Sequence, residues 1–114
     1  MQQDLMECAY NDFHQSDAKL NKLYRKLIAA AETADKASKS DDDNVGNYES
    51  DLRQSEKAWV VFRDAECART SAPNHILYGL EGDLDYPECL AGMTEERIKQ
   101  LSAVTPRGTS DGSN

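Results

Sequence analysis

The sequence predicts an all-α, single-domain protein in which two long antiparallel helices form a hairpin and a shorter third helix follows. Apolar residues recur at every third or fourth position through two long stretches without glycine or proline, which is the spacing of one helix face. Glycines and prolines are frequent in residues 73–92, and a helix-start pattern comes directly after them. The length of 114 residues fits one domain, which we expect over residues 1–105, followed by a disordered tail over residues 106–114.

The first helix is predicted from about Gln3 to Ala37. Its C-terminal end is rich in alanine, the residue with the highest helix propensity. Its apolar stripe comprises Met6, Ala9, Tyr10, Phe13, Leu20, Leu23, Tyr24, Leu27, Ile28 and Ala31. Asp17 interrupts this stripe at a position where an apolar residue is expected, so we expect it to face a partner on another helix.

The second helix is predicted from about Tyr48 to Arg69, and Pro73 is expected to end it. The aromatic residues Trp59 and Phe62 recur at helical spacing, which is typical of a core-facing side. Between the two helices, residues 38–47 are rich in serine, aspartate and asparagine, which favour turns and helix caps.

The hairpin fixes which residues of the two long helices face each other. With a turn centred near residue 40 or 41, the numbers of facing residues sum to about 80–82. Asp17 then lies opposite Arg63, and Tyr24 lies near Glu56. We predict a structural Asp17–Arg63 ion pair in a partly buried seam, where it fixes the register rather than adding much net stability.

Residues 73–92 carry no clean hydrophobic period and are predicted to form an ordered loop. The third helix is predicted to begin at Thr94, whose hydroxyl is a favourable N-cap and is followed by Glu95 and Glu96 in the positive first turn. It is expected to end before Pro106.

The formal net charge is −8, from 13 basic and 21 acidic residues. This balance argues against nucleic acid or an anionic membrane as the partner, and permits a basic protein. The longest apolar run, residues 58–62, is far shorter than the roughly 20 residues of a membrane span. The start of the chain has neither the basic nor the apolar region of a signal peptide. The acidic surplus lies in two spans without a basic residue, 41–51 and 81–96, whose candidate partner-binding residues are Asp41, Asp42, Asp43, Glu81, Asp83, Asp85 and Glu88.

Sequence patterns of enzymes are missing. The two histidines, His14 and His75, stand apart, and no glycine-rich phosphate loop, HExxH or GxSxG motif is present. The acidic turn at 41–46 resembles a calcium loop superficially, but Leu52 occupies the position of the bidentate glutamate. We therefore expect no catalytic residue, no cofactor and no metal site.

The three cysteines, Cys8, Cys67 and Cys89, leave three interpretations open. A Cys67–Cys89 disulfide would close the loop before the third helix and imply an oxidising compartment. Antiparallel packing would also allow a Cys8–Cys67 pair. The remaining interpretation is a cytosolic protein with three reduced cysteines.

Three segments together resemble a known family. They are Asp17-Ala18-Lys19-Leu20-Asn21-Lys22-Leu23-Tyr24, then residues 58–67 with the letters AWVVFRDAEC, and finally Cys89 with Met93-Thr94-Glu95-Glu96-Arg97 and Leu101. Their order and spacing resemble the LprI-like family of small bacterial extracytoplasmic helical proteins, over roughly residues 1–103. The family motif positions in this chain are Leu20, Asn21, Tyr24, Trp59, Asp64, Thr94 and Arg97. Glu56 departs from the pattern, because the family usually has glutamine there.

The resemblance implies a Cys67–Cys89 disulfide that staples the loop before the third helix, with a family cysteine upstream of Cys8 as the usual partner of Cys8. It also implies an extracytoplasmic location, whether periplasmic, secreted or anchored to the envelope. The family is named for a lysozyme-inhibiting member, so the implied function is a binding protein that inhibits a lysozyme, with a basic protein as partner. The alternative is a structural or adaptor module of the cell envelope with an unrelated protein partner.

Overall fold

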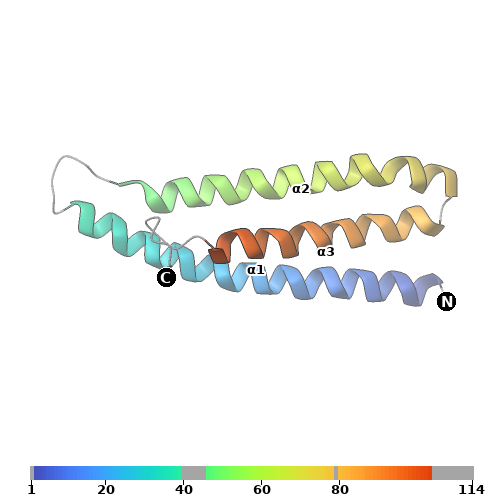
Figure 1. The fold of residues 1–114 in the computed structure, drawn as a ribbon, viewed down its shortest axis with the longest axis horizontal. Helices are drawn as coiled ribbons and strands as arrows, with labels where there is room; N and C mark the ends of the chain where they lie inside the picture. The colour runs from blue at the N-terminus through green and yellow to red at the C-terminus, as the bar shows by residue number, and fades with distance from the viewer. Residues whose placement is uncertain (1, 40–45, 79, 104–114) are drawn as a thin grey trace.

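The protein consists of three helices: α1 (Gln2–Lys39), α2 (Tyr48–Tyr78) and α3 (Leu80–Ala103) (Figure 1). The computed structural model describes the backbone of residues 2–39, 46–78 and 80–103, and the side chains of residues 4–38, 46–71 and 84–103. The prediction of an all-α fold with two long helices and a shorter third one is confirmed. The predicted tail, residues 106–114, lies outside the described residues.

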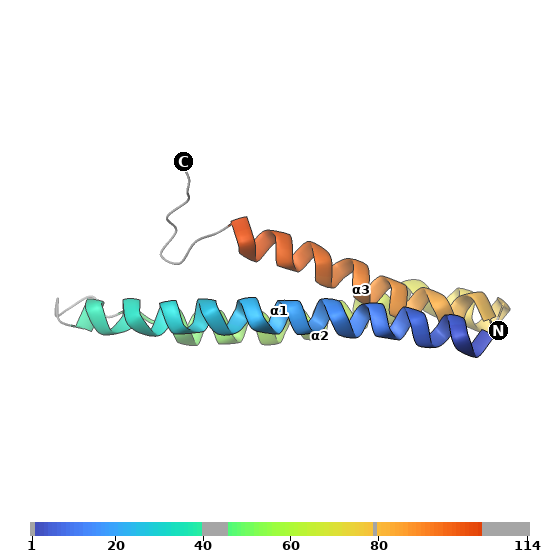
Figure 2. The same ribbon diagram turned by 90° about the horizontal axis from the view of Figure 1, so that it is seen from below.

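α3 packs against both α1 and α2 from one side of the hairpin and runs parallel to α1 (Figures 1 and 2). It contacts each long helix more extensively than the long helices contact each other. The three helices together form a rod of 59 × 24 × 21 Å. The C-terminal end of α3 tilts away from α1 (Figure 2), and α1 and α2 continue past it. We call residues 28–38 and 46–53 the two-helix end, and the remainder the three-helix part.

The prediction of a loop over residues 73–92 is wrong. α2 continues through Pro73 to Tyr78, and α3 begins at Leu80 and contains Pro87 in its interior. Proline removes a backbone donor and disfavours a helix locally, but tertiary contacts override such propensities. Pro87 is among the fully buried side chains, so its ring is packed against neighbouring elements. Thr94 consequently lies inside α3 and does not start a helix.

The interior of the bundle is mixed in polarity. Leu20 is 1% exposed, and the other buried apolar residues are mostly small: Ala9, Ile28, Ala31, Cys67 and Leu90. They are accompanied by buried polar residues, namely Ser16, Glu56, Arg63, Ser71 and Thr94. The expectation of Phe62 as a core aromatic is wrong, because its side chain is 55% exposed. α3 packs on the side of α2 that carries Glu56, Arg63 and Cys67, so this side faces the interior and the side with Phe62 does not.

At the two-helix end, a side chain of α1 caps the start of α2. The backbone amides of Tyr48 and Glu49 donate to Asp35 Oδ1 and Oδ2, at 2.8 and 3.2 Å. The carboxylate thus satisfies two amides that a helix N-terminus leaves without partners, and it lies at the positive end of the helix dipole. The amide of Gly46 donates to Ser38 Oγ at 2.7 Å. A Cβ at Gly46 would lie 2.6 Å from the exposed Tyr48 ring, so a larger residue there would force this ring to shift.

Candidate functional site

Arg63 lies at the centre of the contacts between the three helices. Its side chain, from α2, is 8% exposed, and its Nε donates to Asp64 Oδ1 at 2.9 Å. Its Nη1 lies 3.4 Å from Thr94 Oγ1 on α3 and 3.7 Å from Asp17 Oδ1 on α1. Asp64 therefore provides the shorter ion pair, and Asp17 a longer one across the bundle. A buried guanidinium with these partners links all three helices at one point.

Two aromatic rings enclose the same guanidinium. The Cζ of Arg63 lies 5.1 Å from the centroid of Phe13 on α1 and 5.2 Å from that of Trp59 on α2. Arg97 of α3 also approaches Trp59, at 5.6 Å from the ring centroid. Both arginines are within the range of cation–π attraction, which strengthens as the groups leave water. Trp59 therefore serves as the contact surface of two cations and is only half-buried.

Arg97 forms a second inter-helix ion pair. Its Nε donates to Glu56 Oε1 at 3.1 Å, and both side chains are largely buried. Its Nη2 donates to Ser55 Oγ and its Nη1 to Gln100 Oε1, at 3.3 and 3.2 Å. Glu56 of α2 thus supplies a carboxylate opposite Arg97 of α3.

A third polar contact joins α1 to α3. Ser16 Oγ donates to Glu95 Oε2 at 2.6 Å across the two helices. A hydrogen bond to a carboxylate is stronger than a neutral one and costs more when a partner is lost. We call the residues of these contacts the polar seam: Ser16, Asp17, Glu56, Arg63, Asp64, Thr94, Glu95 and Arg97.

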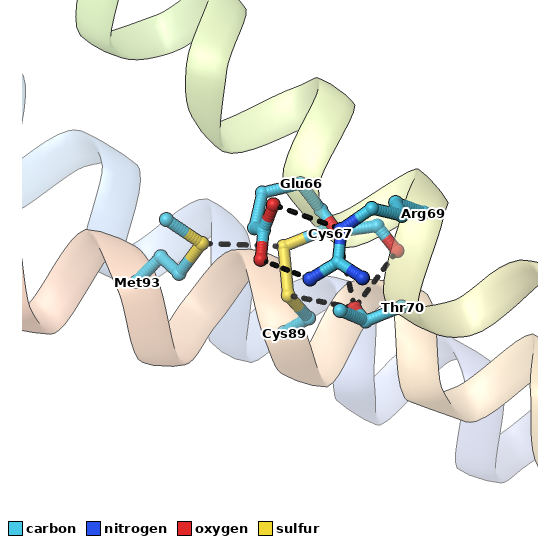
Figure 3. Close-up of polar contacts among 6 residues, drawn as sticks. All are labelled: Glu66, Cys67, Arg69, Thr70, Cys89 and Met93. Atoms are coloured by element: carbon cyan, nitrogen blue, oxygen red, sulfur yellow. Dashed lines mark hydrogen bonds and ion pairs between the residues drawn. A yellow bond between two sulfur atoms is a disulfide. The ribbon is translucent and has the colours of Figure 1, made fainter.

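The disulfide Cys67–Cys89 joins α2 to α3, with a Cα–Cα distance of 5.6 Å (Figure 3). Cys67 is fully buried, and its sulfur lies 3.6 Å from Met93 Sδ. Beside it on α2, Arg69 donates to Glu66 at 2.6 Å, and this hydrogen bond lowers the pKa of the Glu66 carboxyl. Cys8 is a free, exposed thiol on α1. The disulfide expected from the resemblance is confirmed, although it connects two helices rather than stapling a loop.

The sequence matches the family described as "Lysozyme inhibitor LprI" over residues 1–101, which is most of the chain. The chain belongs to the LprI family. An uncharacterized protein of Rhizobium meliloti (strain 1021) is 32% identical over 109 residues, covering 90% of this chain and 73% of the relative. No solved structure matches the chain.

The LprI motif residues contribute mainly to helix contacts. Asp64, Thr94 and Arg97 belong to the polar seam, and Leu20 is buried in the core. Asn21, by contrast, is exposed on α1. Ser16 and Glu95 also belong to the polar seam, and no sequence pattern indicates their contact. A serine on a helix surface is common, and a glutamate is favourable in the first turn of a helix, so neither residue type by itself indicates a contact between helices.

A shallow groove of about 360 Å³ lies between α1 and α2. It is lined by Tyr24, Arg53, Glu56, Lys57 and Val60, which agrees with the expectation of Tyr24 near Glu56. Burial raises the pKa of the Tyr24 phenol; Arg53 opposes this shift and Glu56 adds to it.

Four of the expected partner-binding acids belong to the start of α3. Glu88 is exposed and Asp85 half-buried near the start of α3. Glu81 and Asp83 lie in the first turn of the same helix, but their side chains are outside the described ones. Asp41, Asp42 and Asp43 lie outside the described residues altogether.

The polar side chains of this site hold the three helices together. The guanidinium groups of Arg63 and Arg97 are occupied by carboxylates, hydroxyls and rings. Within residues 4–38, 46–71 and 84–103 no group of three or more histidine, cysteine or acidic side chains could hold a metal ion. No helix in the described part of the chain is long and apolar enough to cross a membrane.

Proposed function

We propose that this chain is an extracytoplasmic binding protein of the bacterial cell envelope that inhibits a basic lysozyme. The observation that carries the proposal is the match over residues 1–101 to a family described as lysozyme inhibitors. The Cys67–Cys89 disulfide supports the extracytoplasmic placement, because disulfides persist in oxidising compartments and are rare in the cytosol.

The charge of the chain supports a basic partner. With a net charge of −8, the protein attracts cationic proteins over a distance set by the salt concentration. Such attraction raises the association rate and selects partners by sign of charge. A complex formed in this way weakens as salt increases, which provides a direct measure of the electrostatic contribution.

The acidic start of α3 is the surface that we assign to this contact. Glu88 is exposed and adjoins Cys89, so the disulfide holds this turn against α2. A surface that is already fixed before binding loses less conformational entropy in the complex. The start of α3 also contains Glu81, Asp83 and Asp85, so four acids lie within residues 81–88.

A lysis assay tests the proposal. The clearing of a bacterial wall suspension by a basic lysozyme is followed with and without this protein, at low and at high salt. We expect inhibition at micromolar excess in low salt and weaker inhibition in high salt. Absence of inhibition at low salt would contradict the proposal and leave the adaptor function, with an unrelated partner in the envelope.

Charge-neutral variants locate the surface. The α3 variant replaces three acids by their amides: Glu81→Gln, Asp83→Asn and Glu88→Gln. A matched control removes the same charge from exposed sites of α1: Glu7→Gln, Asp12→Asn and Glu32→Gln. We expect the α3 variant to lose about tenfold in inhibition and the control much less. Equal losses would show that net charge matters and that this surface does not. The corresponding variant of Asp41, Asp42 and Asp43 tests the other acidic span.

A further inference from the structure

The outer side of α2 carries exposed apolar side chains. Val61 is 65% exposed and Phe62 55%, although both stand in the most apolar run of the chain. α2 forms one edge of the molecule, with α3 and α1 on its other side (Figure 1). Large apolar residues that remain exposed side by side indicate an interaction surface more often than chance.

The exposed residues of this face follow a heptad pattern. They are spaced alternately by four and three positions along α2, which is the repeat of a helix that packs against another helix: Gln54, Ala58, Val61, Ala65 and Ala68. Small residues at these positions permit close approach of two helices. The inward side of α2 holds Glu56, Arg63 and Cys67 and is a different side of the helix.

We propose that this face binds the same face of a second copy of the chain, with the two α2 helices antiparallel about a two-fold axis. Each contact is then made twice, as in any two-fold dimer. In the register that we infer, Ala58 packs against Val61 of the second copy, and Gln54 packs against Ala65 of the second copy. Phe62 then covers Ser55 of the second copy.

Charge complementarity selects a second copy as the occupant and fixes this register. Lys57 and Asp64 lie seven residues apart on the same flank of the apolar face, and this flank meets itself in an antiparallel pair. In the inferred register Lys57 faces Asp64 of the second copy, so two ion pairs form by symmetry. Shifting one helix by a heptad would instead place Asp64 against Asp64 of the second copy, which is repulsive. Lys57 is exposed, and the Asp64 side chain is 49% exposed beside Arg63, so both groups can be reached.

The test is the molar mass in solution. Light scattering or sedimentation equilibrium is carried out in a Cys8→Ser background, because the exposed Cys8 thiol could link two chains covalently. A single pair of helices is a small interface, so we expect a dimer that forms at about 10–100 µM. Val61→Glu places a charge in the centre of the face and is expected to give a monomer. Leu5→Glu is the matched control, since Leu5 is 53% exposed on α1, and it should remain dimeric.

A second pair of variants tests the register. Lys57→Glu places an acid opposite Asp64 and should raise the dissociation constant of the dimer about tenfold, an effect that high salt reduces. Lys57→Gln should have a smaller effect. Circular dichroism shows whether each variant keeps its helices. A monomer at all concentrations, or a dimer that persists in folded Val61→Glu, would overturn the proposal. The measurement is independent of lysozyme, so its failure is distinct from a failure of the inhibition assay.

Discussion

The two ends of the rod are held together by different interactions. In the three-helix part, a disulfide and the polar seam connect α3 to both long helices, and Leu20, Cys67 and Thr94 are almost fully buried. At the two-helix end, the described contacts between α1 and α2 include the Asp35 cap of α2, the hydrogen bond from Gly46 to Ser38 and the burial of Ile28. Cross-linking and burial are thus concentrated at the end where α3 begins.

This difference teaches how a chain with few large apolar core residues keeps a fixed helix arrangement. Apolar burial alone is modest here, since only six hydrophobic residues and Pro87 are buried among the described residues. Directional contacts therefore define how the three helices align, because each ion pair or hydrogen bond is satisfied in one register. The two-helix end instead relies on the cap that fixes where α2 begins.

Removal of the disulfide should have the largest effect. Cys67→Ser with Cys89→Ser is expected to lower the free energy of unfolding by about 3 kcal/mol, because the unfolded chain regains the entropy that the cross-link removes. Urea unfolding followed by circular dichroism measures the change. Cys8→Ser is the control and should unfold like the parent protein. A double variant as stable as the parent would show that the seam alone holds α3 in place.

Breaking the polar seam should come next. Arg63→Met is expected to cost about 2 kcal/mol, because it leaves Asp17 and Thr94 without their cationic partner in a partly buried site. Arg53→Met is the matched control, since Arg53 makes an exposed pair with Glu49 at 2.9 Å. Exposed pairs of this kind contribute little to stability, because water and salt screen them. Equal losses in both variants would mean that the seam adds nothing beyond a surface ion pair.

Much of this fold could be predicted from the sequence. The period of the apolar residues predicted the two long helices, and hairpin geometry predicted that Asp17 faces Arg63. In the structure Asp17 Oδ1 lies 3.7 Å from Arg63 Nη1. Charges are good markers of register, because a carboxylate on an apolar stripe has few places where it can be accommodated. The cysteine pair followed from the family resemblance and not from the spacing alone.

The errors share one physical cause. Proline and glycine at residues 73–92 are local signals of a loop, whereas the packing of α3 that outweighs them depends on residues far away in sequence. The same reasoning explains Phe62, which hydrophobicity assigns to the core. The inward side of α2 is instead determined by contacts with α3, where Arg97 pairs with Glu56 and Thr94 with Arg63. The local sequence around Thr94 and Arg97 indicates a helix start and does not indicate these contacts.

A cap variant examines the two-helix end. Asp35→Ala should lower the free energy of unfolding by about 1 kcal/mol, because the amides of Tyr48 and Glu49 lose their acceptor. Glu32→Ala removes an exposed acid from the same helix and serves as the control. Hydrogen exchange should show faster exchange at the start of α2 in Asp35→Ala alone. Unchanged exchange there would indicate that the cap does not hold this end.

Alkaline titration should give the smallest effect. It connects the two regions, because Tyr24 lines the groove between α1 and α2, which contains Arg53 of the two-helix end and Glu56 of the three-helix part. Burial raises the pKa of Tyr24 above its ordinary value of 10.0, so the folded protein holds this proton more tightly than the unfolded chain does. The associated stability is fully present below pH 10.0 and is lost as the pH rises through the raised pKa. Burial also raises the pKa of Tyr86, so both phenols contribute to the late component of the ultraviolet titration of the folded protein. Tyr24→Phe should therefore reduce this component, whereas Tyr48→Phe, which removes an exposed ring, should leave it unchanged. If Tyr24→Phe leaves the late component undiminished, the groove is more open to water than its lining residues indicate.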